Sequence, residues 1–99
     1  MENAKQEDVL FTIRQVAKLC TAALPDAAVE YALRELQAIE LAVAEHWPLS
    51  ADEKDQISLG PFAAKNLADW NPVLSTALMR LAYSLRRDGE SLERVFHPA

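Results

Sequence analysis

The sequence predicts an all-α fold, a compact bundle of four to five short helices in a single domain over residues 1–99. Glu, Arg, Gln and Lys fill most polar positions and lose little side-chain freedom in a helix, whereas only 2 residues are glycine. Hydrophobic residues make up 51% of the chain, which is enough for one core at this length. Apolar residues recur at helical spacing and form no alternating run of the kind that predicts a strand.

Two helices are expected in the first half of the chain. The first runs over Glu7–Ala23 and is ended by Pro25, because proline cannot donate the helical hydrogen bond. The second runs over Asp26–His46, with Asp26 as its N-cap and Pro48 beyond its end. The apolar face of the first helix consists of Leu10, Ile13, Ala17, Cys20 and Leu24, widened by Val9 and Val16. The face of the second consists of Val29, Ala32, Leu33, Leu36, Ile39 and Val43.

A capping box marks the start of the third helix. Ser50 and Glu53 have the spacing at which each side chain accepts a hydrogen bond from the other residue's backbone N–H. Gly60–Pro61 then predicts a break or kink, because proline removes a helical donor. A second short helix is expected over Pro61–Asp69.

The last long helix has the cleanest apolar stripe in the chain. Asn71 is its expected N-cap, Pro72 takes the first helical position, and Asp88–Gly89 ends it. The tail over residues 90–99 is polar and is expected either to dock as a short turn or to fray. The stripe consists of Leu74, Ala77, Leu78, Leu81 and Leu85, and the apolar anchors of the tail are Leu92, Val95 and Phe96.

The charge of the chain limits its partners. The net charge is -5, whereas binding to nucleic acid or to an anionic membrane requires a basic surface. Neither partner is therefore expected, and a basic protein is the favoured one. No apolar stretch is long enough to span a bilayer, and the N-terminus lacks the apolar region of a signal peptide. A cytoplasmic location follows as the expectation.

Catalysis is not expected. Cys20 lies on an apolar stripe, and its only possible bases, His46 and His97, lie near segment ends. A buried structural thiol is the simpler interpretation. A metal ion needs three or four ligands, which one cysteine and two distant histidines do not supply. We therefore expect neither an enzyme nor a bound cofactor or metal.

The second half of the chain carries a set of residues that points to a known family. These are Leu59-Gly60, Ala63, Lys65, Pro72-x-Leu74-Ser75-x-Ala77-Leu78 and Tyr83, with Leu36-Gln37-x-Ile39 upstream. They resemble the immunity proteins paired with a type VI secretion effector that hydrolyses NAD(P)+. The resemblance covers most of the chain and is most specific between Leu59 and Arg86. Pro61 and Trp70 depart from the family pattern.

The resemblance implies a small helical bundle that binds a cognate toxin domain in the cytoplasm and blocks its active site. That toxin would be an NAD(P)+ glycohydrolase or another nucleotide-directed enzyme. The alternative is a non-catalytic helical adaptor or a regulatory protein-binding module with a different target. In either case the free protein is expected to be a monomer or a weak homodimer.

Five residues are the predicted contacts with that partner. Glu30, Glu35 and Glu40 are acidic positions along the second helix, where a basic toxin cleft would be attracted. Asp69 and Trp70 lie in the loop before the last helix, and tryptophan is enriched among interface hot spots. The sequence thus predicts an acidic surface with an aromatic anchor.

Overall fold

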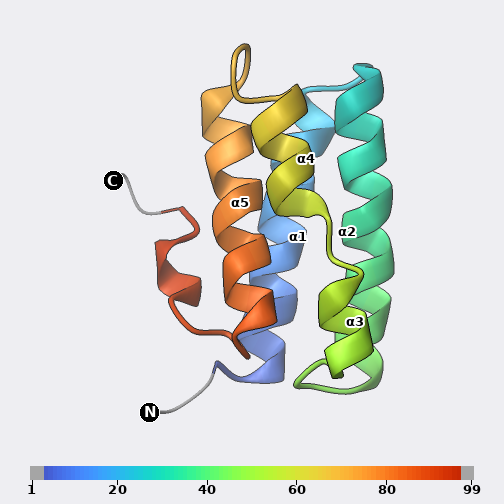
Figure 1. Ribbon diagram of the computed structural model, residues 1–99, viewed down its shortest axis with the longest axis vertical. Helices are drawn as coiled ribbons and strands as arrows, with labels where there is room; N and C mark the ends of the chain where they lie inside the picture. Colours follow the sequence, from blue (N-terminus) through green and yellow to red (C-terminus); the bar gives the residue numbers. More distant parts are fainter. Residues whose placement is uncertain (1–3, 97–99) are drawn as a thin grey trace.

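The computed structural model describes residues 4–96, which form five α-helices and one 3-10 turn and contain no strand. This confirms the predicted all-α bundle of four to five short helices. Figure 1 shows α1, α2, α4 and α5 running alternately up and down the molecule, with α3 at the lower end between α2 and α4. The elements are α1 (Gln6–Ala22), α2 (Ala27–Glu45), α3 (Ala51–Asp55), α4 (Leu59–Asn66), α5 (Pro72–Arg86) and the 3-10 turn η1 (Leu92–Arg94).

The predicted N-caps are confirmed at three helix starts. The Asp26 carboxylate accepts hydrogen bonds from the N–H groups two and three positions on, at 2.9 and 3.1 Å. Both bonds of the capping box between Ser50 and Glu53 are present, at 2.8 and 3.2 Å. The Asn71 side chain accepts the N–H three positions on at 3.2 Å. Each cap satisfies backbone donors that have no acceptor within their own helix.

The predicted break between the two short helices is present, but its predicted position at Gly60–Pro61 is wrong. The chain leaves the helical conformation over residues 56–58, and α4 begins at Leu59, so the glycine and proline lie in its first turn. First-turn N–H groups have no helical acceptor, and a proline there removes no hydrogen bond. This short helix also ends at Asn66, before the predicted end at Asp69.

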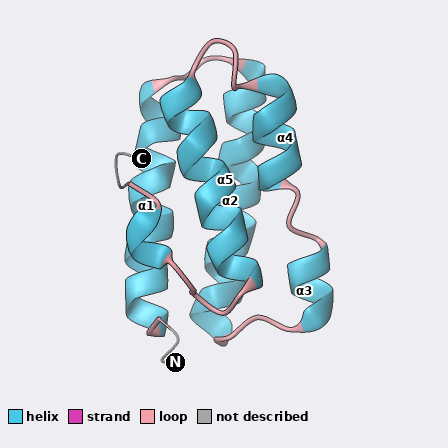
Figure 2. Ribbon diagram, turned by 60° about the vertical axis from the view of Figure 1, so that its left-hand side comes forward, coloured by secondary structure: helices cyan, strands magenta, loops and turns pink. Residues whose placement is uncertain are grey.

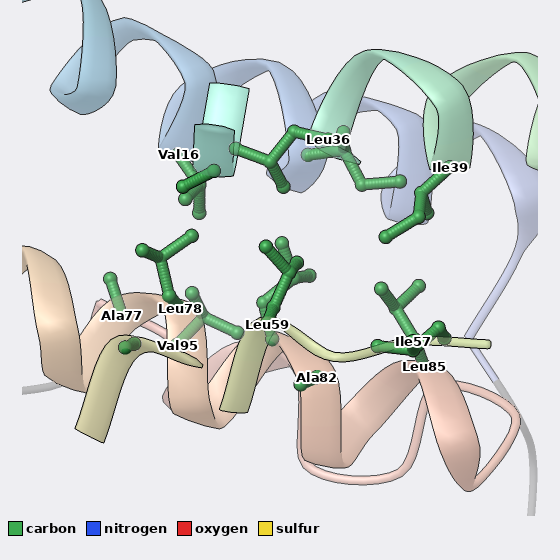
Figure 3. Close-up of a cluster of buried hydrophobic side chains, with 14 of the residues drawn as sticks. Val16, Leu36, Ile39, Ile57, Leu59, Ala77, Leu78, Ala82, Leu85 and Val95 are labelled. Carbon is green, nitrogen blue, oxygen red and sulfur yellow. The ribbon is translucent and has the colours of Figure 1, made fainter. Parts of the chain in front are cut away.

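The core lies between the α1–α2 hairpin and the α4–α5 hairpin. Figure 3 shows Val16, Leu36 and Ile39 from the first hairpin facing Leu59 and Leu78 from the second. The predicted apolar faces of α2 and α5 are buried there, although Leu33 of α2 is only partly buried. One cluster of buried side chains thus joins the two hairpins.

The apolar face of α1 is rotated from the one predicted. Its buried residues are Val9, Ile13, Val16 and Cys20. Leu10 is only partly buried, and Leu24 is 37% exposed in the loop after the helix. The valines expected at the margin of the stripe are therefore at its centre.

The tail docks on the bundle as a short turn. Leu92 and Val95 are buried, whereas Phe96 is 48% exposed. The turn before η1 has positive φ angles at Asp88 (56°) and Gly89 (92°). The predicted tail residues 97–99, including His97, lie outside the described residues.

Candidate partner-binding surface

Cys20 has the properties of a structural thiol. Its side chain has no exposed surface, and desolvation by burial raises the pKa of the thiol to about 11. The thiol is therefore protonated at neutral pH, whereas a nucleophilic cysteine needs the thiolate. Within residues 4–96, no cluster of three or more His, Cys, Asp or Glu side chains could hold a metal ion.

The three predicted glutamates of α2 point in different directions. They are spaced five residues apart, which displaces each by about 140° around the helix from the one before it. Glu30 is exposed and forms a 3.9 Å ion pair with Arg34, four residues along the same helix. They therefore do not form the single acidic face that the sequence suggested.

Glu35 and Glu40 hold contacts inside the protein. The Glu35 carboxylate accepts hydrogen bonds from the backbone N–H of Ser58 at 2.9 Å and from its hydroxyl at 2.6 Å. It thereby fixes the start of α4, because Ser58 is the residue before that helix. Glu40 accepts a hydrogen bond from the Arg14 Nε at 2.8 Å and joins α2 to α1. Both carboxylates already serve as structural links between helices.

Alanine at Glu35 should lower the free energy of unfolding by about 1–3 kcal/mol, because both donors of Ser58 then lose their acceptor. Urea unfolding of the variant measures this cost. The matched control is Glu45→Ala, an exposed glutamate on the same helix, which should change stability by less than about 0.5 kcal/mol. Equal effects of the two substitutions would show that the Glu35 contacts contribute nothing to stability.

Aromatic side chains cover the outer seam between α2 and α4. The ring of Tyr31 stacks on that of Phe62, with ring centroids 4.4 Å apart and 30° between the planes. The side-chain amide of Asn66, one turn further along α4, donates to the backbone carbonyl of Phe62 at 3.0 Å. The Trp70 indole N–H in turn donates to the backbone carbonyl of Asn66 at 3.1 Å. Tyr31 of α2 thus stacks on Phe62 of α4, and Trp70 is held just beyond the end of α4; we call these three residues the aromatic row.

Two acidic residues adjoin this row. Glu30 directly precedes Tyr31, and Asp69 directly precedes Trp70; both acids are exposed. Figures 1 and 2 show the α4–α5 loop and the start of α2 at the same end of the bundle. We call Glu30, Tyr31, Phe62, Asp69 and Trp70 together the aromatic–acidic surface.

The aromatic–acidic surface contains three of the five predicted contacts and two residues that the sequence analysis missed. Tyr31 and Trp70 are 49% and 50% exposed, respectively, so about half of each side chain is open to a partner. Contiguous exposed apolar groups rimmed by polar residues are typical of interaction sites. Tyr31 and Phe62 were missed because their stacking joins two residues that are 31 positions apart in the sequence.

Comparison of the chain with protein-family models, with curated proteins and with solved structures gave no match. None of the helices formed by residues 4–96 is both long and apolar enough to cross a membrane. The chemistry of the aromatic–acidic surface is therefore the main structural evidence that bears on function.

Proposed function

We propose that this protein is an immunity protein, which binds a cognate type VI secretion toxin domain in the cytoplasm and blocks the active site of that toxin. The toxin would be an NAD(P)+ glycohydrolase or another nucleotide-directed enzyme. The observation that supports the proposal most is the aromatic–acidic surface. It offers a protein partner both apolar anchors and negative charge.

The aromatic residues of this surface are held in place before any partner binds. Tyr31 is stacked on Phe62, and the Trp70 indole is fixed by its bond to the Asn66 carbonyl. Side chains that are already ordered lose little entropy on binding, and Trp and Tyr dominate interface hot spots. The surface is therefore suited to tight association.

The charge of the surface suits a toxin that acts on nucleotides. A cleft that binds a phosphorylated substrate is generally basic, and the exposed acids Glu30 and Asp69 each lie next to an aromatic residue of the surface. The net charge of -5 would steer a basic partner toward the protein. An inhibitor that covers such a cleft needs no catalytic group of its own.

A helical adaptor is the second candidate function. The aromatic–acidic surface would serve an adaptor equally well, because its charge and aromatic side chains favour a basic protein partner but do not specify what binding does to that partner. The two functions differ in whether the partner is toxic to the cell. A non-toxic partner would favour the adaptor.

The first place to look for the cognate toxin is the product of the gene beside the one that encodes this chain. Alanine at Trp70 should weaken binding to that product by about 30-fold or more, because a half-exposed tryptophan anchor is lost. Calorimetric titration of the purified proteins measures this change. The matched control is Leu41→Ala, since Leu41 is 68% exposed on α2 but is not part of the aromatic–acidic surface. Equal affinities of the two variants would remove Trp70 from the interface.

A further inference from the structure

The α4–α5 hairpin is basic in an otherwise acidic protein. Residues 59–87 contain Lys65, Arg80, Arg86 and Arg87 but only one acid, Asp69. Residues 5–56 instead contain twice as many acidic as basic residues. Opposite charges are therefore segregated between the two halves of the bundle.

An open groove of about 550 Å³ lies where the start of α4 meets the C-terminal half of α5. Pro61, Met79 and Tyr83 contribute apolar surface to it, and Arg86 and Arg87 contribute the charge. No acidic residue is among the described residues that line it. We call this feature the basic groove.

The side of the basic groove that α5 contributes is partly ordered before any partner binds. The Arg87 guanidinium lies over the Tyr83 ring, 4.6 Å from its centroid. Its ion pair with Glu90 is long, at 3.9 Å, and exposed, so little of its charge is neutralised. Met79 and Tyr83 are 43% and 47% exposed, and methionine adapts its shape to varied partners.

We propose that the basic groove docks an acidic amphipathic helix of a protein partner. Met79, Tyr83 and Arg86 lie on successive turns of α5. A partner helix with apolar side chains on consecutive turns, followed by a glutamate or aspartate one turn on, would match this order. Its apolar side chains contact Met79 and Tyr83, and its carboxylate pairs with Arg86 and Arg87.

This proposal does not depend on the toxin-binding role. The basic groove and the aromatic–acidic surface share no residue, so either can be removed without changing the side chains of the other. The small number of basic residues in the groove also favours a protein partner over a nucleic acid. Two arginines in a chain of net charge -5 are too few to hold a phosphate backbone.

The test uses a fluorescent helical peptide of about 18 residues, with leucine on consecutive turns and glutamate one turn beyond. A second peptide replaces each glutamate with lysine. Fluorescence anisotropy should show binding of the acidic peptide only, weakened by added salt. The variant Arg86→Gln/Arg87→Gln should bind it about fivefold or more weakly. Amide NMR shifts should change around Gly60 and Tyr83 in the unmodified protein.

The control variant Lys18→Gln/Arg34→Gln removes the same charge from the α1–α2 hairpin and should bind like the unmodified protein. Absence of binding, equal binding of the lysine peptide, or equal losses in the two variants would overturn the proposal. Sedimentation of the protein alone provides a further check. Self-association that is lost in the Arg86→Gln/Arg87→Gln variant would make a second copy of the chain the occupant and would also overturn it.

Discussion

Alanine at Leu78 should lower the free energy of unfolding by about 3–4 kcal/mol. The Leu78 side chain has no exposed surface and faces the first hairpin across the core (Figure 3). Removing its branched end takes away apolar burial and leaves a cavity. The surrounding helices can close this cavity only in part, because the core also joins them at other points.

Urea unfolding followed by circular dichroism measures this loss. Leu41→Ala is the matched control, because Leu41 is 68% exposed and its truncation should cost less than about 0.5 kcal/mol. A cost at Leu78 below about 1 kcal/mol would mean that the two hairpins do not share a tightly packed core. The expected loss is a large share of the total stability, about 5–15 kcal/mol, of an ordinary domain.

Alanine at Gly89 should cost about 2–4 kcal/mol for two independent reasons. The backbone there has a φ angle of 92°, which residues with a side chain rarely adopt. An added Cβ would also lie 2.5 Å from the Ala4 Cβ and 2.9 Å from its backbone nitrogen. The turn after α5 would have to move away from the N-terminal segment.

Gly60→Ala is the control for this substitution, because the chain has only 2 glycines and they differ in setting. Gly60 is in a helix, and a Cβ added there would meet the Ala82 Cβ at an ordinary 3.7 Å. Its replacement should leave stability within about 1 kcal/mol of the original or raise it. Thermal unfolding of both variants compares them, and similar losses at the two glycines would contradict the geometry described for the tail.

The helix starts could be predicted from sequence because their causes are local. Asp26, Ser50 and Asn71 each accept hydrogen bonds from N–H groups within three residues. The error at Gly60–Pro61 has an equally local origin. Proline is compatible with the first turn of a helix as well as with a break, and the sequence alone does not indicate which of the two applies.

The side of α1 that is buried is determined by the helices that pack against it. Apolar residues cover more than half of that helix's circumference, so the sequence allows several orientations. Packing against α2 and α5 places Val9 and Val16 at the centre of the buried face. The part of a broad stripe that faces inward is a property of the assembled bundle.

The candidate surface was predicted only in part because its contacts join residues distant in sequence. Glu40 pairs with Arg14, 26 positions away, and Glu35 is bonded to Ser58, 23 positions away. Nothing near these glutamates in sequence indicates that they are already engaged. The stacking of Tyr31 on Phe62 is likewise a tertiary contact between α2 and α4. Trp70 could be singled out because it lies in a polar loop.

The most direct test of the proposed immunity is a growth measurement on bacteria that produce the neighbouring gene product. That product should stop growth alone, and co-production of this protein should restore it. The Leu41→Ala variant should protect fully, whereas Trp70→Ala should protect poorly at equal protein levels. A neighbouring product that is harmless, or one whose toxicity persists when this protein is co-produced, would contradict the immunity role.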